Sequence, residues 1–400
     1  MSRDKEVRAL LVGGPMYDGL YARIPEFERQ TGLRVEVVGR LPHPELNARA
    51  LRDFGAGSAD VDLLSTHTKY APAQARWLAP LDDLIEPAAL ADLLPRPLEL
   101  ARVEARLLQY PRNLDCGLLY YRRDLFESAG RGVPETWDEL VEAATSFAAR
   151  GVHGFLFPGR DSGLFGLFYQ VLVSAGGELF DETLRPAFDS PAGHYAANLL
   201  AELHHRRRTT PAELPHWHFD EVSAAFRRGE AAMVADWPGS DYLYADPRTS
   251  VVADRTGLAR LPGGPGGRRA AYAGCHSFAI PKAARNRAGA LELLHFFTSK
   301  ESQLDEAGRG ALPVRRTAFE AMRKAKADPR KAERLELLAQ TSEDLIIPPR
   351  FAAYPACEDA IWRGVQKAMT GVLTPRDAVH EAARAVADVV SHSAQPLEVR

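Results

Sequence analysis

Apolar runs of strand length alternate with helical stripes from the beginning of the chain. Residues 7–12 form the first run, and apolar positions at helical spacing follow until Thr31-Gly32, where glycine is typical of a helix end. Two further apolar runs occupy residues 33–38 and 61–64. This βαβαβ order predicts an α/β protein with a mostly parallel sheet, in which the carboxyl ends of the strands line a ligand site.

Later segments carry well-marked helix signals. Thr136 and Glu139 form a capping box, and Ser190-Pro191 places an N-cap residue ahead of a proline in the first turn. Residues 290–297 and 379–390 carry apolar stripes at spacings of three and four residues. No internal repeat is visible in the sequence, so we expect ordinary globular domains rather than a repeat architecture.

Length and composition limit the number of domains and the classes of protein to be considered. A chain of 400 residues suits two domains, and a hydrophobic fraction of 46% is that of a globular protein. The formal net charge is −3 with acidic and basic residues interspersed, so we expect no nucleic-acid partner. No apolar run reaches the roughly 18 residues that a membrane-spanning helix needs.

The beginning of the chain leaves its location open. The polar residues 1–6 lead directly into the first strand. The apolar run that follows is too short for the core of a secretory signal and does not end at a small-residue cleavage site. No signal peptide is visible in this chain. Either a leader is missing from this sequence or the protein stays inside the cell.

The sequence offers little reactive chemistry. The three cysteines have no zinc-site spacing; we expect buried free thiols, although one disulfide bridge remains possible. The histidine pairs at 204–205 and 216–218 lack neighbouring ligands at metal spacing. No nucleophile-elbow, zinc-protease or nucleotide-binding motif is present. We therefore expect no catalytic residues, no metal and no cofactor. The cysteines are Cys116, Cys275 and Cys357.

Several segments occur in the order of a known family. Residues 110–126 (YPRNLDCGLLYYRRDLF) are the most specific, and residues 134–140 (PETWDEL) follow soon after. The other matching segments are 27–35, 59–64 with 77–85, 226–233 and 296–303. Together they resemble the extracellular solute-binding proteins of carbohydrate ABC importers, the group that includes maltose-binding protein. The resemblance covers nearly the whole chain.

The resemblance implies a fold and its domain boundaries. This fold is the periplasmic-binding-protein type II fold, with two α/β lobes around a central cleft and three hinge crossings. By resemblance, the crossings lie near Leu114-Asp115, Cys275-His276 and Leu312-Pro313. Lobe one is then 1–114 plus 277–313, and lobe two is 115–276 plus 314–400. Such hinges permit closure on a ligand, because only a few backbone dihedral angles need to change.

The resemblance also implies a function. It predicts a substrate-binding protein of an ABC importer that holds a carbohydrate, either a mono- or an oligosaccharide, between its lobes. Such a protein delivers the sugar to membrane permease subunits, is not an enzyme, and works as a monomer in the periplasm or elsewhere outside the cytoplasm. The alternatives are a cytosolic carbohydrate-active enzyme or sugar sensor, and an acidic or phosphorylated sugar as ligand.

Candidate ligand residues of lobe two lie in loops beside aromatic side chains. Trp237 follows an apolar run, at a loop where this family commonly contacts ligand, and a core tryptophan is the alternative. Asp236 and Ser240 belong to the same loop. Arg160 precedes an aromatic helix whose N-terminus offers free N–H groups. Trp362 falls where maltose-binding protein has a stacking tryptophan, although it could equally be core.

Candidate residues of lobe one follow its strands. His67, Thr68 and Lys69 come just after the third strand and could bind hydroxyl groups or pair with an acidic ligand, with a solvated loop as the alternative. Maltose-binding protein would have an acidic residue near His67, so a shared ligand is in doubt. Tyr17 occupies the first strand-to-helix loop, and Arg40 ends the second strand, where an exposed side chain is the alternative.

The expected crossings add the remaining candidates. Arg112, Asn113 and Asp115 surround the first crossing, where one is expected to face the ligand and the others to satisfy backbone groups. Gly274 and His276 lie at the second crossing, and the glycine permits a ligand to approach the backbone.

Overall fold

The computed structural model describes residues 5–57, 60–324 and 329–393. Its internal contacts divide the chain into two compact units. The first unit contains residues 1–115, 274–332 and 350–352, and the second contains 116–273, 333–349 and 353–400. Both mix strands and helices, so the predicted α/β class is confirmed.

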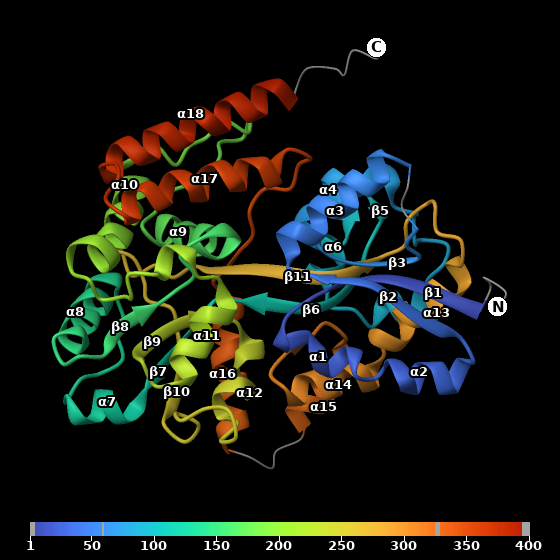
Figure 1. Ribbon diagram of the computed structural model, residues 1–400, viewed down its shortest axis with the longest axis horizontal. Helices are drawn as coiled ribbons and strands as arrows, with labels where there is room; N and C mark the ends of the chain where they lie inside the picture. Colours follow the sequence, from blue (N-terminus) through green and yellow to red (C-terminus); the bar gives the residue numbers. More distant parts are fainter. Residues whose placement is uncertain (1–4, 58–59, 325–328, 394–400) are drawn as a thin grey trace. The chain divides into compact units, whose positions relative to one another are not determined.

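The first unit is built on a sheet with strand order β12-β6-β11-β3-β1-β2 (Figure 1). β1 pairs in parallel with both β2 and β3, which confirms the parallel core predicted from the three apolar runs. β11 runs antiparallel to β3, and β12 antiparallel to β6, so the complete sheet is mixed. The strand bounds are β1 Glu6–Val12, β2 Arg34–Leu41, β3 Leu63–His67, β6 Tyr110–Cys116, β11 Ala271–Ala279 and β12 Leu312–Pro313.

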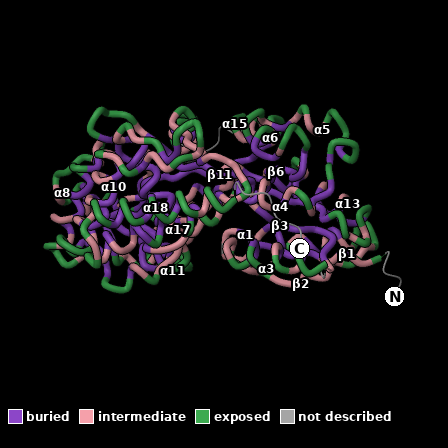
Figure 2. Tube along the Cα trace, turned by 90° about the horizontal axis from the view of Figure 1, so that it is seen from above, coloured by how far each residue is buried: buried purple, intermediate pink, exposed green. Residues whose placement is uncertain are grey.

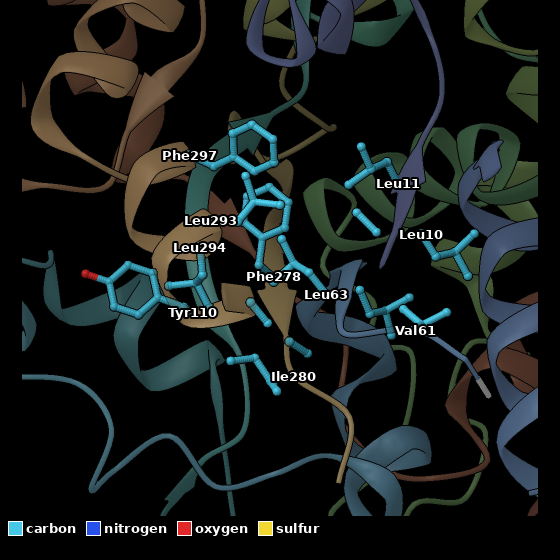
Figure 3. Close-up of a cluster of buried hydrophobic side chains, with 14 of the residues drawn as sticks. Leu10, Leu11, Val61, Leu63, Tyr110, Phe278, Ile280, Leu293, Leu294 and Phe297 are labelled. Atoms are coloured by element: carbon cyan, nitrogen blue, oxygen red, sulfur yellow. The ribbon is translucent and has the colours of Figure 1, made fainter. Parts of the chain in front are cut away.

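Helices of the first unit follow the predicted pattern. α2 ends at Gly32, whose φ of 73° is left-handed, as expected of a glycine C-cap. A buried core joins α13 to the sheet: Leu293 and Phe297 pack with Phe278 of β11 and Leu63 of β3 (Figure 3). The helices and short strands are α1 Pro15–Tyr21, α2 Ile24–Thr31, α3 His43–Gly55, α4 Ala71–Gln74, α5 Pro87–Ala91, α6 Pro95–Leu100, β4 Arg102–Val103, β5 Arg106–Leu107, α13 Arg287–Phe297, α14 Lys300–Gly308 and α15 Arg316–Lys324.

The second unit contains a sheet with strand order β10-β7-β9-β8. β9 and β8 are parallel, whereas β7 is antiparallel to both β9 and β10. Every residue of β9 is buried. In Figure 2 the buried residues lie in the interior of each unit and the exposed residues lie on its outside. β13 pairs with Ala271 and Tyr272 at the beginning of β11. The strands are β7 Leu118–Arg122, β8 His153–Leu156, β9 Ala231–Asp236, β10 Thr256–Arg260 and β13 Leu345–Ile346.

Four helices of the second unit, α9, α10, α17 and α18, pack on one another. α17 lies beside α18, α9 and α10 (Figure 1). The predicted capping box of Thr136 and Glu139 is confirmed at α8, and Ser190 caps α10. The helices are α7 Arg123–Ser128, α8 Trp137–Ala148, α9 Asp161–Ser174, α10 Pro191–Ala201, α11 Phe219–Arg227, α12 Asp241–Ala245, α17 Tyr354–Met369 and α18 Pro375–Ser393. α16 Pro329–Ser342 begins in the first unit and continues into the second. None of the helices within the described ranges is long and apolar enough to cross a membrane.

The first unit extends further along the chain than the expected lobe one. Residues 314–324, expected in lobe two, group with the first unit, because α15 packs against α14 and β12. The chain passes between units after residues 115, 273, 332, 349 and 352. That these crossings act as hinges stays a prediction. Cys116, Cys275 and Cys357 are buried and free.

Candidate functional site

Three histidines gather in the first unit at the carboxyl end of β3. His67 ends β3 and lies opposite His276 in the β11 register, and His43 begins α3. We call these three residues the histidine cluster. The ring centroids of His43 and His276 are 4.6 Å apart, and those of His67 and His276 are 5.3 Å apart. The strand end at which the sequence predicted ligand residues therefore carries a compact cluster of polar side chains.

Hydrogen bonds fix the orientation of His276. Its Nε2 lies 2.8 Å from Oδ2 of Asp115, which also accepts from Nδ2 of Asn113 at 3.0 Å. A carboxylate can only accept, so Nε2 of His276 carries the proton. Nδ1 of His276 and Nε2 of His43 are hydrogen-bonded at 2.7 Å, and the ring that carries the proton at this contact is the donor. The hydroxyl of Tyr17 lies 3.3 Å from Nε2 of His276.

His67 is held as a neutral ring. Burial, followed by the positive fields of His276 and Lys69, lowers the pKa of His67 well below its usual value. Its Nδ1 accepts from the backbone N–H of Lys69 at 3.1 Å, so the proton is on Nε2. Gly274 lies against this ring: a Cβ at that position would come 2.2 Å from Nε2. Thr68 and Lys69 are buried in the short turn that follows.

The arginine candidates of the first unit pair with acids. Arg112 forms a buried ion pair with Glu306, in which Nε donates at 3.2 Å and Nη2 donates to Oε1. Burial opposes the charge of Arg112, but the Glu306 carboxylate more than offsets this and raises the pKa of Arg112. The guanidinium lies 5.0 Å from the ring centre of Tyr17 and so supports that ring. Arg40 lies 3.4 Å from Asp18 at the surface.

A small pocket opens in the second unit where β9 ends. Its volume is about 20 Å³, which is comparable to the space that a single water molecule needs. The ring of Trp237 lies 5.3 Å from that of Phe219 and 6.0 Å from that of Tyr272. These aromatic residues line the pocket together with Gln170, Asp236 and Leu261.

Asp236 organises the loop that carries Trp237. Its carboxylate accepts from the backbone N–H of Trp237 at 2.8 Å and from the hydroxyls of Tyr244 and Ser240. Burial raises the pKa of Asp236 to about 6, and these hydrogen bonds offset part of that rise. The carboxylate therefore holds the loop in place and has little capacity left for a ligand.

The structure brings most of the predicted residues together, in one group within each unit. Tyr17, His67, Asn113, Asp115, Gly274 and His276 surround one centre in the first unit, with Thr68, Lys69 and Arg112 beside them. Asp236, Trp237 and Ser240 share the loop of the second unit. Their part in binding stays a prediction.

Three candidates are not in these groups: Arg40, described above, and Arg160 and Trp362 of the second unit. Arg160 precedes α9 and lies 3.4 Å from Asp161. The indole of Trp362 donates to Asp359 on its own helix at 2.9 Å and does not line the described pocket. No group of three His, Cys, Asp or Glu side chains in the described part of the chain could hold a metal ion.

Sequence reasoning missed His43, Phe219 and Gln170. His43 comes two residues after the end of β2, so the strand-end rule that selected His67 could have found it. Phe219 and Gln170 lie within helices, and only the folded chain brings them to the end of β9.

Comparison with known proteins identifies related sequences. The family model of the bacterial extracellular solute-binding proteins matches residues 13–304. A probable amino-acid ABC transporter periplasmic-binding protein of Sinorhizobium fredii is 25% identical over 394 residues, covering 94% of this chain and 87% of its own. A mannitol-binding protein of Pseudomonas aeruginosa is 28% identical over 270 residues, covering 64% of this chain and 60% of its own.

Solved structures give the same fold. Maltose-bound MalE3 of T. maritima has a TM-score of 0.88 and 30% identity, covering 95% of this chain and 98% of its own. A ribitol-bound solute-binding protein of Agrobacterium radiobacter has a TM-score of 0.85 at 24% identity, covering 96% of this chain and 98% of its own, and shows the fold alone. The predicted type II periplasmic-binding-protein fold is thereby confirmed.

Proposed function

The chain belongs to the bacterial extracellular solute-binding proteins, and on this premise we propose that it binds a neutral carbohydrate for an ABC importer. The observation that carries the proposal is the aromatic pocket at the end of β9, where Trp237 lies beside Phe219 and Tyr272. Aromatic faces with a few placed polar groups suit the C–H face and the hydroxyl groups of a sugar ring.

The first unit carries a second set of placed polar groups, in the histidine cluster. In the histidine cluster, the rings and the Asp115 carboxylate are fixed by one another and by Tyr17. Such preorganisation lowers the entropy lost on binding. MalE3, named as maltose-bound, and the relative named as mannitol-binding support a sugar or a polyol as the ligand class.

The charges favour a neutral ligand over an acidic or phosphorylated one. Arg112 is neutralised by Glu306, and Arg40 and Arg160 lie near Asp18 and Asp161. His67 stays neutral because its pKa is lowered. An anionic ligand would have to compete with these carboxylates for each arginine.

The protein would act by reversible binding and would catalyse nothing. The family implies that it meets its ligand outside the cytoplasm and delivers it to permease subunits, and we expect a monomer. A cytosolic enzyme or sugar sensor would instead convert its ligand or act without a permease. The name of the Sinorhizobium relative gives a specific reason to include amino acids in the test.

The test is a thermal-shift screen of the full chain against neutral sugars, polyols, uronic acids, sugar phosphates and amino acids. A ligand at 100 times its Kd stabilises the folded state by about 2.7 kcal/mol. We expect a neutral sugar or polyol to raise the Tm and to be recovered unchanged. Trp237→Ala should remove the shift, whereas Trp237→Phe should keep part of it. A shift from acidic ligands or amino acids alone, or conversion of the ligand, would overturn the proposal.

A further inference from the structure

Gln170 lies in the middle of α9 with its side chain turned into the pocket of the second unit. The residue is 5% exposed and lines the pocket beside Trp237 and Tyr272. Its Oε1 accepts from the backbone N–H of Tyr272 at 2.9 Å. A Cβ at Gly117 would come 2.2 Å from Oε1, so the backbone there closes tightly over the amide.

This hydrogen bond determines which end of the amide faces the pocket. A backbone N–H only donates, so the atom facing Tyr272 must be the oxygen, and the NH₂ group points away from it. Among the described residues, no group accepts from Nε2. This donor is not one of the fully buried side-chain atoms that lack a partner, so it keeps solvent contact at the pocket, where a ligand oxygen can take the place of water.

The rest of the pocket restricts what that ligand group can be. Pro158, Leu167 and Leu261 contribute apolar walls. The Asp236 carboxylate already accepts three hydrogen bonds, so it offers little to an ammonium group and would repel a carboxylate. The space of about 20 Å³ admits one small group. A hydroxymethyl group fits these limits: its carbon contacts the apolar walls and its oxygen accepts from Nε2.

We propose that Gln170 is a specificity residue that binds the hydroxymethyl oxygen of a neutral sugar or polyol. The inference rests on the proposed function and narrows it to ligands with a CH₂OH group that can enter this pocket. Because the oxygen end of Gln170 is fixed by Tyr272, the amide cannot flip to accept from the ligand without losing that bond.

The experiment compares sugars that differ only in this group. Isothermal titration of the full chain uses D-glucose against D-xylose, and D-galactose against L-arabinose. The second sugar of each pair lacks the hydroxymethyl group. We expect the wild type to bind at least one hexose about tenfold more tightly than its pentose, as one lost hydrogen bond predicts.

Gln170→Glu tests the donor itself. The variant keeps an oxygen for the N–H of Tyr272 but replaces the NH₂ donor with an acceptor, so the hexose-to-pentose ratio should fall to about one. Gln170→Leu, which adds no charge, is the second variant and should lower the ratio in the same way. A purely structural role for Gln170 would weaken hexose and pentose equally and leave the ratio unchanged.

Two outcomes would overturn the inference and separate it from the proposed function. If both variants still bind sugars with an unchanged hexose-to-pentose affinity ratio, Gln170 does not read the hydroxymethyl group, and the proposed sugar binding stands. If no member of either pair binds to the wild type, the hydroxymethyl assignment fails, and the wider thermal-shift screen decides separately on carbohydrate binding.

Discussion

Replacing Gly274 with alanine should disturb the histidine cluster by a steric mechanism that the structure defines. An added Cβ would lie 2.2 Å from Nε2 and 2.6 Å from Cε1 of His67. The ring would have to move by roughly 1 Å to restore ordinary contact. It has little room to do so, because it is buried, accepts from Lys69 N–H and packs against His276.

The expected loss of stability follows from overpacking a rigid site. Forcing extra volume into a well-packed region typically costs 1–3 kcal/mol, so we expect Gly274→Ala to lower the free energy of unfolding by about 2 kcal/mol. Urea denaturation followed by circular dichroism measures this loss. Gly55→Ala is the matched control in the same unit: a Cβ there meets nothing within 4 Å. Alanine is the better helix former, so this control should be neutral or slightly stabilising.

A double-mutant cycle separates the clash from other effects of the substitution. In a His67→Ala background the ring is absent, so Gly274→Ala should lose most of its cost. We expect a coupling energy of at least about 1 kcal/mol between the two positions. Additive effects would refute the reasoning, because they would mean that the alanine destabilises the protein without touching His67.

Three further predictions concern buried charges, each measured by urea denaturation. Glu306→Gln should lower the free energy of unfolding by about 3–5 kcal/mol, because it leaves Arg112 buried without its counter-charge. The double variant Glu306→Gln with Arg112→Met should recover most of this loss. A double variant that is as unstable as the single one would contradict the pairing. The pKa of Asp236 is raised from 3.8 to about 6. Its contribution to stability is therefore present below pH 3.8, and about 3 kcal/mol is lost as the pH rises through 6. Asp236→Asn should remove this pH dependence of the free energy of unfolding, and a variant that keeps it would refute the assignment to Asp236. The pKa of His67 is lowered from 6.5, so the stability present above pH 6.5 is lost as the pH falls below it; His67→Gln should show a smaller loss between pH 6.5 and 5, and an identical profile would exclude His67 as the cause.

Local sequence rules predicted the elements that local physics determines. The three apolar runs became β1, β2 and β3, and the capping box at Thr136 formed with both of its hydrogen bonds. Gly32 took the left-handed conformation expected at a helix end. Each of these depends on neighbours within a few residues, so a single sequence contains the information.

Features that depend on distant contacts could not be predicted in the same way. Residues 314–324 were expected in lobe two, yet α15 packs on α14 and β12 in the first unit. The apolar surface of α15 gives no indication of which sheet it covers. Periodicity identifies the buried face of a helix but not its partner.

The candidate site shows the same limit at the level of single residues. Arg112 was expected near the ligand because of its position beside the first crossing, and the structure pairs it with Glu306, far away in the sequence. Gln170 was not singled out because it lies in a helix dominated by aromatic residues such as Phe165, Phe168 and Tyr169. Its polar role depends on the backbone of Tyr272, a contact across 102 residues.

Both units use the absence of a side chain to hold a ring close to the backbone. In the first unit, the ring of His67 lies where a Cβ at Gly274 would be. In the second, a Cβ at Gly166 of α9 would come 2.6 Å from the ring of Tyr272. Steric contact fixes these rings, so fewer hydrogen-bonding groups are needed to position them. Polar groups that are not used for positioning, such as Nε2 of Gln170, remain available to a ligand, and a rigid arrangement of this kind reduces the entropy that binding must overcome.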